Sequence, residues 1–210
     1  MLDRIARGRI LPVVILEDIQ AAEPLAEALL AGGLDVMEIT FRTPAASGAI
    51  RRIAKAFPQI LLGAGTLLDR EQVLEAREAG AVFGLAPGLN PRVVEAAIDC
   101  GMTFVPGVMT PSEVDQALEL GCKLQKLFPS GLAGGVEMLK ALAGPFAHTG
   151  VRFIPMGGIN PDNLGGYLKL PIVAAAGGSW MVDRTLIAAR RWDEITRLCR
   201  EALAIAAEAT

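Results

Sequence analysis

Short apolar runs alternate with longer amphipathic segments along the whole chain, and this alternation restricts the fold more than any other feature. The runs are almost continuously apolar, as is typical of parallel strands that are covered on both faces. Between them, apolar side chains recur at helical spacing, for example at Val73, Ala76 and Ala79. We expect eight strands from these runs, at residues 10–16, 35–40, 60–66, 81–87, 103–108, 124–129, 152–157 and 172–177.

Capping residues and glycines mark the expected helix ends. A threonine or asparagine precedes a proline at four expected helix starts, in the pairs Thr43-Pro44, Asn90-Pro91, Thr110-Pro111 and Asn160-Pro161. Thr110 and Glu113 also have the spacing of a capping box. Glycines fall where four helices should end, each just before a strand, at Gly33, Gly80, Gly101 and Gly121.

Eight strand–helix units predict an α/β protein in which residues 1–210 form a single (β/α)8 TIM barrel domain. The barrel is lean, because about 250 residues are typical of this architecture. An open doubly wound sheet is the alternative. The first strand–helix turn lacks a G-x-G-x-x-G fingerprint, which weakens a dinucleotide-binding version of that alternative.

The composition excludes several classes of protein. A net charge of −3 provides no basic field for nucleic acid, and no apolar run approaches the roughly 20 residues that span a bilayer. Glu17 and Asp18 follow the first run directly, unlike the residues after a signal peptide. The three cysteines are isolated, which favours a reducing compartment and argues against disulfides and a zinc ribbon. An apolar content of 52% favours burial of some surface in an oligomer.

The chain contains one histidine, His148. A Ser-His-Asp triad would depend on it, and a catalytic zinc with several histidine ligands cannot be built from it. Pro145 and Gly150 flank it, which predicts a surface connection. We therefore expect His148 to be a solvated loop residue and expect no metal site.

Lys126 interrupts the apolar run 124–129, which ends at Pro129. Burial disfavours a charged ammonium, whereas a neutral buried amine is a good nucleophile toward a ketone. Lys126 is therefore a candidate nucleophile, with a buried structural ion pair as the alternative.

Glu38 is the second ionisable residue inside an apolar run. Catalytic residues of barrels gather at the C-terminal ends of the strands, and both Glu38 and Lys126 lie near such ends. The two could form a structural pair, but desolvation offsets most of the attraction in a buried pair. Because perturbed groups cluster at functional sites, we favour a catalytic role for Glu38.

Other residues at the expected strand ends could hold a ligand. Arg42 follows the second strand, where a guanidinium suits a substrate carboxylate, although a solvated loop arginine is equally consistent. Thr66 follows two glycines that permit close approach of the backbone, or it simply begins the next loop. Gly157-Gly158 and Gly178-Ser179 follow the seventh and eighth strands, where barrels frequently bind phosphate.

Eight short motifs occur together and in order along nearly the whole chain. They are Glu38-x-x-x-Arg42-Thr43-Pro44, Gly63-Ala64-Gly65-Thr66, Pro87-Gly88-Leu89, Pro106-Gly107, Lys126-Leu127-Phe128-Pro129, Gly144-Pro145-Phe146, Gly157-Gly158-Ile159 and Gly177-Gly178-Ser179-Trp180. In this combination the chain resembles the class I aldolases that act on 2-keto-3-deoxy-6-phosphogluconate (KDPG), a family that includes the 4-hydroxy-2-oxoglutarate (KHG) aldolases.

The resemblance implies a lyase that reversibly cleaves KDPG to pyruvate and D-glyceraldehyde 3-phosphate in carbohydrate metabolism, within the Entner–Doudoroff pathway. It implies a cytoplasmic homotrimer without a metal or cofactor. It assigns the Schiff base to Lys126 and acid–base catalysis through a bound water to Glu38. The remaining implied roles are carboxylate binding by Arg42 and Thr66 near the Pro87 backbone, and phosphate binding by Gly157, Gly158, Gly178 and Ser179.

Met156 departs from the family pattern. Members that act on the gluconate usually have a threonine directly before Gly157-Gly158, and a thioether cannot donate the hydrogen bond that a hydroxyl donates. The resemblance therefore makes Met156 a substrate-binding residue whose effect on the configuration preferred at C4 is open. The galactonate epimer and KHG are alternative substrates.

Two readings outside aldol chemistry stay open from the residues themselves. One is a phosphate-binding barrel isomerase or synthase in which Glu38 and Lys126 act as an acid–base pair without covalent chemistry. The other is a non-catalytic oligomer with a decayed site, against which the presence of Glu38, Arg42 and Lys126 argues.

Overall fold

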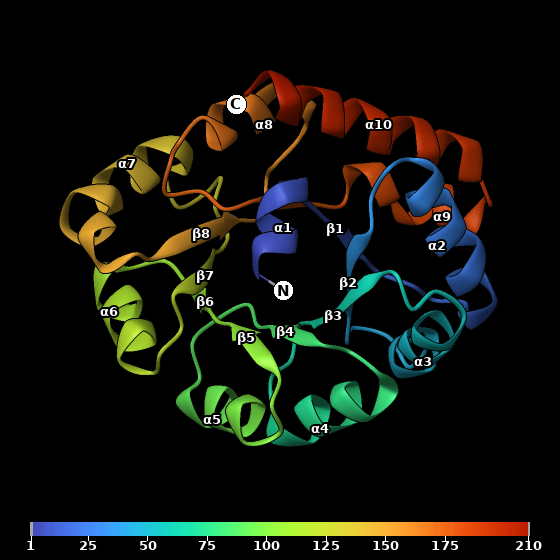
Figure 1. Cartoon of the computed structure of the whole chain (residues 1–210), viewed down its shortest axis with the longest axis horizontal. Coiled ribbons are helices and arrows are strands. Elements are labelled where there is room, and N and C mark those ends of the chain that lie inside the picture. The colour runs from blue at the N-terminus through green and yellow to red at the C-terminus, as the bar shows by residue number, and fades with distance from the viewer. Residues whose placement is uncertain (1, 210) are drawn as a thin grey trace.

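The structure is a computed structural model that describes residues 2–209, and it is an α/β fold with a curved parallel sheet. Its strands stand around the middle of the molecule, with most of the helices outside them (Figure 1). Six strands form one sheet in the order β5-β4-β3-β2-β1-β9, and three more form a second sheet in the order β6-β7-β8. The strands are β1 (Ile10–Val14), β2 (Val36–Thr40), β3 (Leu61–Gly65), β4 (Phe83–Leu85), β5 (Thr103–Val105), β6 (Gly107–Val108), β7 (Leu124–Leu127), β8 (Arg152–Pro155) and β9 (Ala176–Gly178).

The two sheets approach each other at both edges. On one side only Pro106 separates β5 from β6, and its carbonyl accepts a hydrogen bond from the Lys126 N–H at 2.8 Å. On the other side, isolated parallel bridges join Phe153 to Val173 and Met156 to Gly177. The predicted strand 103–108 is therefore split in two, because proline has no N–H for a ladder.

The bounds of the eighth predicted strand, 172–177, are wrong at its start, since the observed strand β9 runs from Ala176 to Gly178. Regular strand begins only at Ala176, and the preceding residues contact β8 through single hydrogen bonds, such as the one from the Ala174 N–H to the Phe153 carbonyl. Val173 and its neighbours are apolar because they are buried, and a buried apolar run does not by itself determine where strand hydrogen bonding begins.

Helices follow most of the strands and cover their outer face (Figure 1). The α-helices are α1 (Leu2–Gly8), α2 (Ala22–Ala31), α3 (Ala46–Ala56), α4 (Arg70–Ala79), α5 (Pro91–Asp99), α6 (Pro111–Glu119), α7 (Gly135–Phe146), α8 (Pro161–Leu168), α9 (Arg184–Ala188) and α10 (Trp192–Glu208). Short 3-10 helices lie at η1 (Ile19–Ala21), η2 (Ala147–Thr149) and η3 (Trp180–Val182). Among the described residues, no helix is long and apolar enough to cross a membrane.

The predicted helix starts are confirmed at three points and wrong at one. Asn90, Thr110 and Asn160 cap α5, α6 and α8, each followed by proline, and Thr110 with Glu113 forms the predicted capping box. Thr43 caps nothing, because its hydroxyl donates to the Leu16 carbonyl at 2.5 Å and α3 begins later. The four predicted helix-end glycines all have positive φ, between 69° and 110°.

Helix α1 was not predicted from the sequence. It lies at the centre of the view in Figure 1, among the strands rather than outside them. Ile5 of this helix is fully buried and packs in an apolar cluster with interior strand residues such as Leu11, Phe83 and Ile154. This cluster fills the space that the strands surround, and Ile5 closes one end of it.

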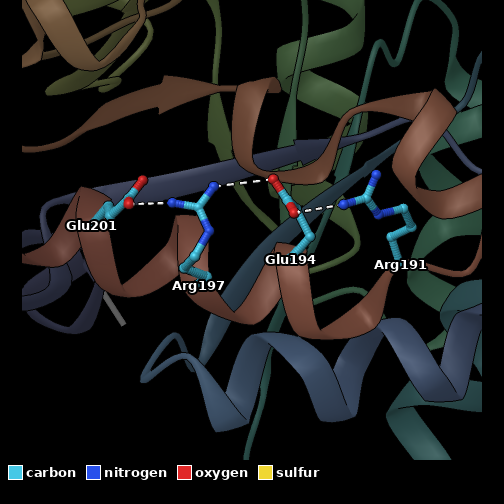
Figure 2. Close-up of polar contacts among 4 residues, drawn as sticks. All are labelled: Arg191, Glu194, Arg197 and Glu201. Atoms are coloured by element: carbon cyan, nitrogen blue, oxygen red, sulfur yellow. Dashed lines mark hydrogen bonds and ion pairs between the residues drawn. The ribbon is translucent and has the colours of Figure 1, made fainter.

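The surface of α10 carries a chain of ion pairs. Arg197 contacts both Glu194, at 3.0 Å, and Glu201, while Arg191 contacts Glu194 at 2.9 Å (Figure 2). These side chains are partly or largely exposed, so solvent screens the pairs and they add little to stability. His148 is exposed in η2, as predicted for a solvated connection.

All three cysteines are free thiols in the structure. Cys199 is fully buried, and burial raises the pKa of its thiol to about 12. It is therefore kept as an uncharged packing residue of α10.

Gly63 leaves room for the ring of Phe83 in the interior cluster, because a Cβ at position 63 would lie 2.2 Å from that ring. We expect Gly63→Ala to lower the free energy of unfolding by about 1–3 kcal/mol, the usual cost of overpacking. Gly166→Ala is the matched control, since the exposed Gly166 lies inside α8 and a Cβ there would meet only an ordinary contact, 3.8 Å from Val136. The control should gain roughly 0.5–1 kcal/mol. Urea unfolding measures both, and a Gly63→Ala protein as stable as wild type contradicts this packing.

Candidate active site

Lys126 points into the apolar interior. Leu124, two residues before it, belongs to the interior cluster and Phe128, two residues after it, packs against that cluster, as expected when alternate residues share a face. The Lys126 side chain is only 6% exposed. The strand holds it firmly, because β7 pairs in parallel with β6 through Gly107 and with β8 through Ile154.

Glu38 reaches the same interior from β2, the strand that also contributes Val36 to the cluster. Its carboxylate is fully buried, and its Oε1 lies 3.8 Å from the Lys126 Nζ. That separation is within reach of an ion pair but too long for a hydrogen bond. Among the residues that the structure describes, neither carboxylate oxygen has a hydrogen-bond partner. The predicted pair is therefore assembled, with its acceptor atoms free.

Gly65 makes room for the Glu38 carboxylate. A Cβ built on Gly65 would lie 1.7 Å from Glu38 Oε1 and 2.5 Å from its carboxyl carbon. Any larger residue at position 65 would therefore displace the carboxylate. From the sequence, Gly65 was interpreted as permitting close approach of a ligand, whereas the group that it accommodates is the catalytic candidate itself.

Burial raises the pKa of the Glu38 carboxyl above its ordinary value of 4.5, and the Lys126 ammonium lowers it by less. The Coulomb attraction at this distance is about 4 kcal/mol at an effective dielectric constant near 20. Desolvation costs several kcal/mol for each ion, which outweighs that attraction. Because the folded pKa is raised, the stability that Glu38 contributes is complete below pH 4.5 and is lost as the pH rises through the folded value.

Thr66 directly follows the Gly65 slot and has a positive φ of 58°. A β-branched residue in the left-handed region is strained, at a cost of roughly 1–3 kcal/mol, and such strain is concentrated at functional sites. Thr66 is half-buried, so its hydroxyl is available beside the Glu38 strand. The strain supports the prediction that Thr66 binds a ligand, and the geometry does not test it.

Arg42 lies beyond the end of β2 with its side chain exposed, and it makes no ion pair within residues 2–209. The role of carboxylate fork therefore stays a prediction. Pro87 follows β4, and its carbonyl group lies against Gly107, where a Cβ would come within 2.3 Å of it. Since Gly107 is the parallel partner of Lys126, Pro87 lies near the base of the lysine.

Met156 is buried at the end of β8, and its side chain covers Gly177 of the neighbouring β9. A Cβ on Gly177 would lie 2.6 Å from the Met156 methyl group. Met156 also belongs to the interior cluster against which Phe128 packs. It therefore lines the interior on the same side as Lys126, as expected for a residue that contacts the substrate.

Gly157 and Gly158 follow Met156 with positive φ values of 87° and 83°. Gly178 ends the neighbouring strand β9, and the exposed Ser179 follows it. The bridge between Met156 and Gly177 places these two predicted phosphate-binding ends side by side. Gly178 also has a packing function, since a Cβ there would lie 1.9 Å from the Trp180 ring.

Two residues in and just after the Lys126 strand were not predicted from the sequence to have a role. The Phe128 ring centroid lies 5.1 Å from the Lys126 Nζ, which is within the range of a cation–π contact. Ser130 is fully buried and its hydroxyl donates to the Tyr167 oxygen at 3.3 Å. The alternation Leu124, Lys126, Phe128 could have revealed the first, whereas nothing local in the sequence relates Ser130 to Tyr167.

Comparison with known proteins identifies the family. The family model described as KDPG and KHG aldolase matches residues 1–198. A protein of Treponema pallidum named 2-dehydro-3-deoxy-phosphogluconate aldolase is 45% identical over 203 residues, covering 97% of this chain and 96% of that one. The KHG/KDPG aldolase of Escherichia coli K12 is 44% identical over 196 residues, covering 93% of this chain and 91% of that protein.

A solved structure has the same fold. The KDPG aldolase of Legionella pneumophila, captured with pyruvate as a covalent carbinolamine intermediate, superimposes with a TM-score of 0.92 and 40% sequence identity. The alignment covers 96% of this chain and 97% of that one. Sequence and structure agree over almost the full length, and the chain belongs to the KDPG and KHG aldolase family.

Proposed function

We propose that this protein is a Schiff-base aldolase that reversibly cleaves KDPG to pyruvate and D-glyceraldehyde 3-phosphate. The observation that carries the proposal is the buried amine of Lys126, 3.8 Å from a carboxylate with no hydrogen-bond partner in the described part of the chain. Family membership supports the substrate, since relatives carry the name of this activity. A purely structural ion pair would use its acceptor atoms, so the free oxygens favour catalysis.

The proposed scaffold is a closed (β/α)8 barrel that forms one domain over residues 1–210. The continuity of β5 with β6 and the bridges between β8 and β9 support closure. We further propose a cytoplasmic homotrimer. Exposed large apolar side chains at Leu68, Ile98 and Leu132 favour contact with other subunits, and the free thiols fit a reducing compartment.

Cleavage begins with attack of the neutral Lys126 amine on the C2 ketone of the substrate. The carbinolamine loses water to give an iminium ion, which withdraws electrons from C3. Glu38, through a water molecule, takes the proton from the C4 hydroxyl, and the C3–C4 bond breaks to release the aldehyde. The enamine left on Lys126 is protonated at C3, and water hydrolyses the resulting iminium to pyruvate and free lysine.

The raised pKa of Glu38 suits this sequence, because the same carboxyl must both accept and return protons. Arg42 and Thr66 would bind the carboxylate next to the ketone, near the Pro87 backbone. The backbone of Gly157, Gly158 and Gly178, with the hydroxyl of Ser179, would bind the phosphate at the other end. Met156, between these two regions, would lie opposite C4.

The identity of residue 156 makes the C4 configuration the least determined part of the substrate. A thioether gives no hydrogen-bond donor to a hydroxyl in one configuration. The galactonate epimer of KDPG and unphosphorylated KHG are therefore the alternative substrates for the same chemistry.

Reaction with pyruvate and borohydride tests the Schiff base. We expect wild-type protein to gain one reduced pyruvate adduct by mass spectrometry and Lys126→Ala to gain none, because the nucleophile is gone. Lys123→Ala is the matched control, since Lys123 is an exposed lysine just before the same strand. Labelling that persists in Lys126→Ala sinks the assignment. A wild-type protein without an adduct favours the non-covalent isomerase or synthase reading.

The pH dependence of kcat/KM tests Glu38. Cleavage needs the ionised carboxylate, so kcat/KM should fall as the pH drops through the raised pKa, above 4.5. In Glu38→Gln the rate should fall by about 10²–10⁴-fold, the usual contribution of a general base. The acid side of the plot of log kcat/KM against pH should also lose one unit of slope, because one ionising group has been removed. An unchanged profile in this variant means that Glu38 is not the base.

Met156→Thr tests stereochemical preference at C4. The new hydroxyl supplies a donor beside the substrate, so kcat/KM for the gluconate relative to the galactonate should rise, by roughly 2- to 12-fold for one net hydrogen bond of 0.5–1.5 kcal/mol. Met156→Leu controls for loss of the thioether without adding a donor and should leave the ratio near that of wild type. If the threonine variant keeps the wild-type ratio, residue 156 does not set the preference.

A further inference from the structure

The loop that follows the Lys126 strand contributes one member of a buried pair of hydroxyls. Ser130 is fully buried, and Tyr167, on α8, is 4% exposed. The Ser130 hydroxyl donates to the Tyr167 oxygen at 3.3 Å. Within residues 2–209, this is the hydrogen bond that each hydroxyl makes. Tyr167 is also the one tyrosine of the chain.

The same loop is attached to the loop after β8 by its backbone. The Ser130 N–H donates to the Met156 carbonyl at 2.7 Å, and the Gly131 N–H donates to the Gly157 carbonyl at 2.8 Å. The strand residues upstream are held separately, since Lys126 itself is paired with β6 and β8. A displacement of Ser130 and Gly131 would therefore act on the backbone of Met156 and Gly157 before it moved the amine.

The Tyr167 hydroxyl is enclosed between helix α7 and the loop that carries Ser130. Its oxygen lies 3.0 Å from the position of a Cβ on Gly135, at the start of α7, so helix and loop enclose it. A distance of 3.3 Å is long for two hydroxyls, which makes the hydrogen bond itself weak. The larger effect is the cost of leaving either buried hydroxyl without a partner.

We propose that Tyr167 is a positioning residue for the phosphate end of the substrate, acting through Ser130 on the backbone of Gly157 and Gly158. The inference rests on the proposed function, because it assumes that these glycines bind phosphate. The proposed role can be distinguished from a contribution to stability alone by its dependence on the substrate. Tyr167 should matter for a phosphorylated substrate and not for formation of the pyruvate imine.

Steady-state kinetics with KDPG and with the same sugar acid lacking its phosphate tests the proposal. In Tyr167→Phe and in Ser130→Ala, KM for KDPG should rise about 5-fold or more, because each substitution leaves the other buried hydroxyl without a partner. The kcat/KM for the unphosphorylated acid should stay at the wild-type value. Because the two hydroxyls act as a pair, the double variant should lose no more than either single variant.

Thr196→Val is the control for removal of a hydroxyl away from the site. Thr196 lies on α10 and donates to the Ala28 carbonyl at 2.9 Å. This variant should lose stability but keep the wild-type ratio between the two substrates. An equal loss for both substrates in Tyr167→Phe, no loss for either, or additive losses in the double variant overturns the proposal.

Borohydride trapping of pyruvate in the same variants separates the two hypotheses. All of them should trap pyruvate to the wild-type extent, since pyruvate carries no phosphate. A wild-type enzyme that traps no pyruvate overturns the proposed function and the inference together. Normal trapping combined with an equal kinetic loss for both substrates overturns the role of Tyr167 alone.

Discussion

The site depends on two ionisable groups that lie close together in an apolar interior but do not hydrogen-bond to each other. Lys126 and Glu38 approach to 3.8 Å, which is close enough for attraction but too far for a hydrogen bond. Desolvation outweighs the attraction, so burial keeps the pKa of the Glu38 carboxyl raised. The fold therefore maintains an arrangement that costs stability at neutral pH and leaves both groups available to a substrate.

Glycines in neighbouring strands provide the space for this arrangement. Gly65 accommodates the Glu38 carboxylate, Gly63 accommodates the Phe83 ring, and Gly107 lets the Pro87 carbonyl approach the strand beside Lys126. A side chain at any of these glycines would occupy the space that the neighbouring group takes up. The interior is therefore packed densely around the reacting groups, which limits how far either can relax toward the other.

The sequence predicted the order of strands and helices well because local signals determine them. Asn90, Thr110 and Asn160 cap helices as expected, and Lys126 and Glu38 are buried together as expected. Thr43 has the same local pattern but bonds instead to Leu16, 27 residues away in the chain.

The remaining features depend on contacts distant in sequence. Helix α1 carries no strong signal because its role is to place Ile5 among strands that follow much later. The pairing of Ser130 with Tyr167 spans 37 residues, and the need for glycine at position 65 is apparent only once the Glu38 carboxylate is seen beside it.

A direct measurement of the Glu38 pKa by carbon-13 NMR, in wild type and in Lys126→Met, tests the central claim. We predict a value above 4.5 in wild type and a still higher value in the variant, because the lysine lowers it. A wild-type value at or below 4.5, or a fall when Lys126 is removed, contradicts the account.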